Sequence, residues 1–202
     1  MSREIGLSQL HVFKLTDPDT AAYDAAIPVP WVVSIEASKT VSEFQVFADN
    51  VAEIASSRPT GATLTIEVSS DMTPKLEAQL TGKFYANGMM VGGADETKPQ
   101  WGIAYETVMD NGNTRRYFYT NCTISKNEQS NETISDSITA QTYTLTANCV
   151  PIASTKQTDM VMDEDEMLEA VQEATDDGNV ALAAEIQRVW DEWFTTAPVM
   201  PE

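Results

Sequence analysis

The first 150 residues alternate between apolar and polar side chains in short runs that are separated by turn signals. In the run from Gly61 to Ser69, Leu64, Ile66 and Val68 alternate with threonine and glutamate, so one row of side chains would be buried. Short alternating runs at this spacing are typical of a β-sandwich or barrel. The predicted strands are His11–Leu15, Trp31–Ile35, Glu43–Phe47, Thr63–Val68, Phe84–Val91, Gly102–Val108, Arg115–Thr123 and Ser137–Val150.

A short helix is predicted directly after the fourth of these strands. Asp71 and Thr73 offer side-chain oxygens that can cap its N-terminus, and Pro74 suits the first helical position. Two leucines four residues apart would form its apolar face, and Gly82 would end it. The sequence therefore predicts a mainly β domain with an embedded helix.

Two Asn-Gly pairs, Asn87-Gly88 and Asn111-Gly112, predict β-hairpins, because Asn-Gly is the preferred pair of a two-residue type I′ turn. The segment from Ser34 to Ser57 is predicted to hold a strand pair with a polar, flexible tail at Ala48–Ser57. Hairpin extensions of this kind commonly reach a neighbouring subunit. A solvent-exposed loop is the simpler interpretation of the same residues.

Helical periodicity replaces the alternation after the connection at Pro151–Thr158. The first helix would begin with the acidic turn Asp163–Glu166, which suits the positive end of the helix dipole, and would end at Asp176–Asn179. A second helix is predicted from Val180 to Phe194, with its tryptophans on one apolar face. The chain therefore divides into a β-sandwich domain, residues 1–155, and an acidic helical segment, residues 156–202.

The net charge of the chain indicates which class of partner it is not expected to bind. The formal net charge is -19 over 202 residues, and residues 151–202 hold 13 acidic residues against 2 basic ones. Affinity for nucleic acid depends largely on lysine and arginine displacing counterions from phosphates. A nucleic-acid-binding function is therefore not expected.

Residues that carry chemistry are scarce in this sequence. His11 is the single histidine, so no histidine-based catalytic set or metal cluster can be assembled. Cys122 and Cys149 lie in predicted strands without a C-x-x-C spacing, and we expect buried thiols with no disulfide. Asp163 and Asp165 begin a calcium-loop pattern that lacks its glycine and its closing glutamate. We identify no catalytic, cofactor-binding or metal-binding residue and do not expect an enzyme.

Two further features concern where the protein is made. The N-terminal MSREIGLSQLHVF lacks the uninterrupted apolar core of a secretory signal. The sequence also has no apolar run of about 18 residues, the length that a membrane helix needs. We therefore expect synthesis in the cytoplasm and no membrane anchor.

The order of these features resembles the major tail proteins of long-tailed, non-contractile bacteriophages. The features are Gly6-Leu7, WVVSIEASKTVSEFQVFADN, ATLTIEVSSDMTPKLEAQLTGKFYANGMMV, the aromatic RRYFYTNCTIS and a closing acidic segment with Trp193-Phe194. The similarity is strongest from Thr63 to Tyr85, where the family shows a strand, an acidic-Pro helix start and a Leu-x-Gly exit. The chain differs from the family in its longer acidic helical pair, which leaves the role of residues 156–202 open.

The resemblance implies a structural role without turnover. A tail-tube protein is a β-sandwich with a flanking helix that self-assembles into hexameric rings, and the rings stack into the viral tail tube of the virion. DNA passes through the tube during ejection without sequence-specific binding. The partners implied are further copies of the chain and the tail terminator, distal tail and tape-measure proteins, all in a particle made in the host cytoplasm.

Two alternatives from other classes stay open at this point. A carbohydrate-binding or adhesin β-sandwich would use surface aromatic residues as stacking platforms for glycans, and Trp31, Trp101, Tyr117 and Tyr119 are the candidates. A hydrolase built on a pair of acidic residues would instead lose turnover when one carboxylate is changed.

Overall fold

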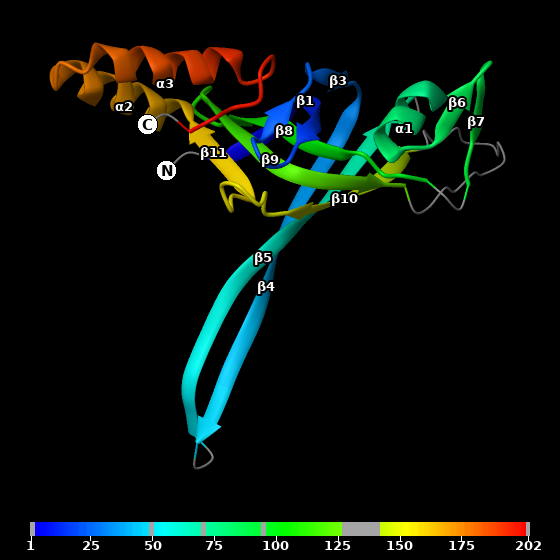
Figure 1. Ribbon diagram of the computed structural model, residues 1–202. Helices are drawn as coiled ribbons and strands as arrows, with labels where there is room; N and C mark the ends of the chain where they lie inside the picture. Colours follow the sequence, from blue (N-terminus) through cyan, green and yellow to red (C-terminus); the bar gives the residue numbers. More distant parts are fainter. Residues whose placement is uncertain (1–2, 49–50, 70–71, 94–95, 127–141, 201–202) are drawn as a thin grey trace.

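The computed structural model shows a mainly β protein with antiparallel pairing and three helices among the residues described (Figure 1). It describes residues 3–48, 51–69, 72–93, 96–126 and 142–200, and over residues 44–48 and 51–56 it describes the backbone alone. The strands are β1 (Glu4–Asp17), β2 (Ala22–Tyr23), β3 (Ile27–Val29), β4 (Val32–Ala48), β5 (Val51–Ser69), β6 (Phe84–Ala86), β7 (Met89–Val91), β8 (Gln100–Met109), β9 (Thr114–Ser125), β10 (Thr142–Val150) and β11 (Asp159–Asp163). The helices are α1 (Pro74–Thr81), α2 (Glu164–Asp176) and α3 (Val180–Glu192).

One large sheet has the strand order β2-β1-β8-β9-β10-β5-β4, and β6 and β7 form a separate hairpin. One edge of β9 is divided between two partners, because β10 pairs with residues 121–125 and β11 pairs with residues 115–119. Leu7 of β1 and Ile35 of β4 pack against the same buried core, although their strands lie near opposite ends of the strand order. The sheet therefore curls around this core, as a sandwich or partly open barrel does.

The alternation in β5 places its side chains as predicted. Leu64, Ile66 and Val68 are fully buried in the main core, together with apolar residues of β1, β8, β9 and β10. Trp101 of β8 is also fully buried, and its indole N–H donates to the backbone carbonyl of Leu80 at 3.0 Å. This hydrogen bond fixes the C-terminal end of α1 on the sheet.

The boundaries of α1 follow from its capping residues. The Thr73 hydroxyl accepts a hydrogen bond from the Leu76 backbone N–H at 3.3 Å, and Pro74 begins the helix. Gly82 ends it with φ of 81°, and a Cβ at Gly82 would stand 2.5 Å from the Thr97 carbonyl oxygen. The prediction of this helix is confirmed. Asp71, the other predicted cap, lies outside the described residues, as does the 137–141 part of the predicted strand Ser137–Val150.

Three details of the strands differ from the sequence prediction. Phe84–Val91 was predicted as one strand, but it forms two strands, β6 and β7, because Asn87 and Gly88 make a turn within it. Trp31–Ile35 and Glu43–Phe47 were predicted as separate strands, but both fall within β4 apart from Trp31, because β4 continues in register with β5. The predictions also omitted β2, β3 and β11, which are short. Length explains the omission, because two to five residues carry too little periodicity to distinguish a strand from a loop.

Both predicted hairpins form, but with different turns. Asn87 and Gly88 have φ of 54° and 79°, as a two-residue type I′ turn requires. At Asn111-Gly112 the predicted turn type is wrong. The Met109 carbonyl accepts from the Gly112 N–H and the Met109 N–H donates to the Asn113 carbonyl, which is the pattern of a three-residue loop with glycine in the left-handed position.

The cysteines also correct a prediction. Cys122 of β9 and Cys149 of β10 are buried, and they form a disulfide instead of the expected unpaired thiols. The physical reason is register, since the two residues stand directly opposite each other on paired antiparallel strands. Composition and spacing could not reveal that arrangement, because 27 residues separate the two cysteines in the sequence.

Residues 156–200 include β11, α2 and α3, with Asp163 capping α2 and Asn179 capping α3. The two predicted helices are confirmed. Val189 of α3 and Trp193, which directly follows α3, pack against Phe13, Ala104 and Phe118 on the face of the sheet opposite the main core. A smaller cluster of Met167, Ile186 and Trp190 joins α2 to α3. The division at residue 155 stays a prediction.

Candidate assembly surfaces

The long hairpin of β4 and β5 is the most prominent feature of the molecule (Figure 1). Its register runs from Val32 opposite Val68 to Ala48 opposite Val51. β10 pairs with β5 only from Ala62 to Ser69, so beyond Gly61 the hairpin leaves the sheet. We call residues 41–60 the arm and the other described residues the body. At about 3.3 Å per residue, eight residues of β4 carry the arm about 25 Å outward.

Close packing defines the base of the arm. A Cβ at Gly61 would stand 2.5 Å from the Cys149 carbonyl oxygen, so glycine is required where β5 passes β10. The Thr60 hydroxyl donates to the Thr40 carbonyl at 3.2 Å. Lys39 forms an ion pair with Asp159 of β11 at 2.9 Å. These contacts fix the direction in which the arm projects from the body.

The arm is a two-stranded hairpin, so the simpler loop interpretation is wrong for residues 41–48 and 51–60. The predicted bounds of the strand pair are also wrong, because residues 51–57, predicted as a flexible tail, form the first part of β5. Two strands isolated from a sheet are marginally stable in water. Their outer edges also carry backbone N–H and C=O groups that can pair with another strand. A two-stranded arm of this length is therefore suited to contact another chain.

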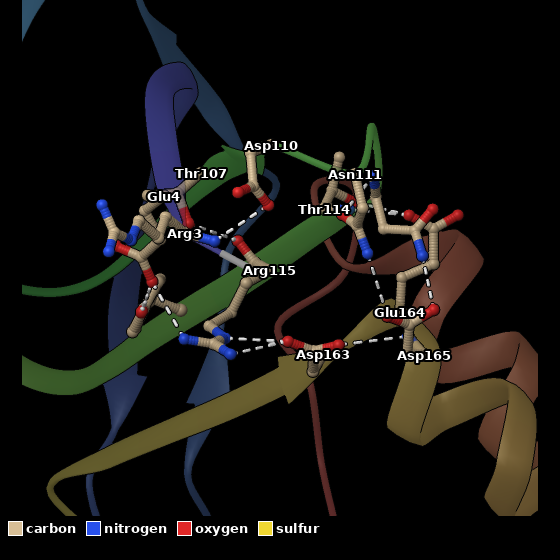
Figure 2. Close-up of polar contacts among 12 residues, drawn as sticks. Arg3, Glu4, Thr107, Asp110, Asn111, Thr114, Arg115, Asp163, Glu164 and Asp165 are labelled. Atoms are coloured by element: carbon tan, nitrogen blue, oxygen red, sulfur yellow. Dashed lines mark hydrogen bonds and ion pairs between the residues drawn. The ribbon is translucent and has the colours of Figure 1, made fainter. Parts of the chain in front are cut away.

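A second region of interest is the polar junction that attaches α2 to the body (Figure 2). Two guanidinium nitrogens of Arg115 lie 2.8 and 2.9 Å from one carboxylate oxygen of Asp163, and a third lies 3.1 Å from Glu4. Glu4 also accepts from the Tyr117 hydroxyl. Burial, followed by this hydrogen bond, raises the pKa of Tyr117 to about 12. The junction thus connects β1, β9 and β11.

The same junction extends to the β8–β9 loop. Asn111 and Asn113 donate their side-chain N–H groups to Asp165, and the Thr114 backbone N–H donates to Glu164 at 2.8 Å. Glu164 and Asp165 of the acidic first turn of α2 therefore accept hydrogen bonds from within the protein. This explains how acidic residues close together in the sequence can be accommodated near the sheet.

Arg116 attaches α3 in a similar way from the next position of β9. Its guanidinium lies 2.9 Å from Glu106, donates to the Trp190 backbone carbonyl and stacks 3.9 Å above the Trp190 ring. The indole N–H of Trp193 donates to the Tyr117 carbonyl at 3.4 Å. Sequence reasoning missed both arginines as attachment residues. Their adjacency in a chain with few basic residues was the available signal.

His11, Asp163 and Met167, which the sequence offered as candidates for a catalytic or metal site, have structural roles in packing and capping. His11 contacts Phe194 with ring centroids 5.1 Å apart, and its buried Nδ1 has no hydrogen-bond partner among the described residues. Burial lowers the pKa of His11. Asp163 caps α2, and Met167 is buried against α3. In the described part of the chain, no group of three or more His, Cys, Asp or Glu residues is arranged to hold a metal ion.

The four aromatic residues proposed as glycan platforms do not form one surface. Trp101 and Tyr119 are buried in the main core, whereas Trp31 is 66% exposed. Tyr117 is partly buried and stacks on Tyr105 with ring centroids 4.8 Å apart. The glycan-binding alternative therefore loses half of its proposed residues. No helix within the described ranges is long and apolar enough to cross a membrane.

Comparison with known proteins gives little further information. No family model matches the sequence, and no curated protein matches it. Among solved structures, the chain is similar to a chain in the cryo-electron microscopy structure of the anti-feeding prophage baseplate, determined with six-fold symmetry. The match has a TM-score of 0.38 and 11% sequence identity, and it covers 80% of this chain and 97% of that chain. A TM-score this low does not establish a shared fold.

Proposed function

We propose that this protein is a structural subunit of a bacteriophage tail, in which copies form hexameric rings that stack into the tail tube. The tube would be the conduit for DNA during genome delivery. The observation that carries the proposal is the arm, a two-stranded extension of about 25 Å. From Gly61 to the tip of the arm, its two strands pair only with each other within the described chain. Its stability and its free edges are both explained if it lies on another copy.

Two further observations support a role in assembly over turnover. The three acidic residues Asp163, Glu164 and Asp165 at the start of α2 are bound to asparagine, threonine and arginine side chains or to a backbone N–H group of the body, so they serve as attachment groups. The formal charge of -19 also suits a conduit for DNA, because a negative wall gives passing phosphates no cations to bind. A tube reconstruction with a wall lined mainly by lysine and arginine would contradict this argument about charge.

Electron microscopy of the purified protein tests the proposal. We expect rings or tubes in negatively stained samples of the wild type. A variant in which an Asn-Gly pair replaces residues 41–60 should fold, because Thr40 and Gly61 are register partners and a two-residue turn can join them. The hydrophobic clusters of the body are built from residues outside the arm, so its melting temperature should change little.

The arm variant should form no tubes at any concentration that gives tubes of the wild type. Leu168→Gln is a matched control, because Leu168 is an exposed apolar residue of α2 outside the arm. This control should assemble like the wild type. A wild type that stays monomeric across protein concentration and salt, or an arm variant that forms normal tubes, would contradict the proposed function.

A further inference from the structure

The β6–β7 hairpin presents an apolar face that nothing in the described chain covers. Phe84 is the register partner of Val91, and Ala86 is the partner of Met89, so these four residues share one face of the hairpin. Phe84 is 68% exposed and Met89 is 65% exposed, and Val91 is exposed as well. The two strands form a sheet of their own, which contacts α1 and pairs with no other described strand. A two-stranded sheet is marginally stable in water and gains stability when its faces are packed. We therefore expect another protein surface to cover this apolar face.

A mostly apolar groove, which could receive the apolar face of the hairpin, lies between β11, α3 and the C-terminal residues. Val161, Val199 and Met200 are exposed there although they are apolar. Methionine side chains adapt well to an inserted aromatic ring. The residues that line the groove include Met160, Val161, Met162, Trp193, Val199 and Met200.

The charges of the two regions also favour their contact. Residues 159–192, which hold β11, α2 and α3, contain 12 acidic residues and a single basic one. Residues 72–99, which hold α1 and the β6–β7 hairpin, contain three lysines and three acidic residues. Two copies that met through their acidic regions would repel each other, whereas residues 72–99 have no net charge, so contact between the unlike regions avoids this repulsion.

The hairpin and the helices α2 and α3 lie at opposite ends of the molecule (Figure 1). We propose that the β6–β7 hairpin of one copy inserts the Phe84 face into the Met160–Trp193 groove of the next copy. Such a contact is heterologous, so each copy uses one end as donor and the other as acceptor, and rotation around an axis can close a ring. This inference rests on the proposed self-assembly and names the surfaces that join neighbours within a ring.

Three variants test the contact. The hairpin variant Phe84→Thr/Met89→Thr removes the apolar face while keeping strand propensity, and Val161→Thr makes the groove polar with little change of shape. Both alter exposed residues, so the melting temperature should be unchanged. Tyr85→Thr is the matched control, because Tyr85 lies on the other face of the same hairpin. Sedimentation velocity and native mass spectrometry measure the assembly state.

We expect the hairpin variant to need about tenfold more protein than the wild type for half-assembly, and Tyr85→Thr to behave as the wild type. An equimolar mixture of the hairpin variant and Val161→Thr should give 1:1 heterodimers, because the mixture contains one intact hairpin and one intact groove per pair. A hairpin variant that assembles at the wild-type concentration overturns this contact and leaves the proposed function standing. Absence of heterodimers also overturns it, and a wild type that never assembles overturns both proposals.

Discussion

A buried ion pair anchors α1, and breaking it gives the sharpest test of the fold. Glu77 of α1 forms an ion pair with Lys126, whose ammonium donates to the Glu77 carboxylate at 2.8 Å, and the two side chains are only 9% and 6% exposed. The Lys126 ammonium also lies 4.0 Å from the centre of the Tyr143 ring. Lys83 contacts the other carboxylate oxygen of Glu77 at 3.4 Å, but its side chain is 26% exposed. The two lysines therefore differ mainly in burial.

Burial sets the size of the expected effect. Glu77→Ala leaves the Lys126 ammonium buried without its carboxylate, and breaking a buried pair in this way costs about 3–5 kcal/mol of unfolding free energy. Lys83→Met removes a partly solvated contact and should cost less than about 1 kcal/mol. The double change Glu77→Leu/Lys126→Met replaces the pair by apolar groups of similar size, and it should recover most of the loss.

Urea denaturation followed by tryptophan fluorescence measures these differences. With a slope of about 2 kcal/mol per molar urea, Glu77→Ala should lower the midpoint by about 2 M, and Lys83→Met by less than about 0.5 M. The double-mutant cycle over Glu77 and Lys126 should give a coupling energy above about 1.5 kcal/mol. Equal losses for Lys83→Met and Lys126→Met, or a loss below about 1 kcal/mol for Glu77→Ala, would refute the reasoning from burial.

Three other perturbations follow from single contacts. Burial lowers the pKa of His11, so the folded state favours the neutral imidazole. The contribution of His11 to the unfolding free energy should therefore be complete above pH 6.5 and should be lost as the pH falls below it. His11→Phe should make the melting temperature depend less on pH in that range. Gly61→Ala should lower the unfolding free energy by about 2 kcal/mol in urea titrations, since its Cβ would stand 2.5 Å from the Cys149 carbonyl oxygen, and an unchanged midpoint would contradict that contact. Removing the disulfide with Cys122→Ala/Cys149→Ala should cost about 3–4 kcal/mol for a closed loop of this length, and reductant should then affect the melting of the wild type but not of the variant.

The embedded helix shows where sequence patterns were sufficient. Thr73, Pro74 and Gly82 define α1 because caps act through hydrogen bonds to backbone groups a few residues away. The acidic turn at Asp163 and the break at Gly178 located α2 and α3 for the same reason. Each of these signals is local, so distant residues had little effect on it.

The attachment of α2 and α3 shows where sequence patterns failed. Arg115 pairs with Asp163, and Arg116 stacks on Trp190, across separations of 48 and 74 residues. β11 pairs with β9 for five residues, too few to give a clear period. The candidate contact between copies depends in the same way on where the β6–β7 hairpin and the groove along β11 lie in the folded molecule.

The sequence by itself determined the elements whose causes are local: alternating strands, capped helices, the Asn87-Gly88 turn and the surplus of negative charge. Only the tertiary structure decided which strand stands beside which, and with that the disulfide, the length of the arm and the buried ion pairs. The physical reason is that strand pairing joins residues far apart in the chain. A hydrophobic period reports that a face is buried, but not what buries it.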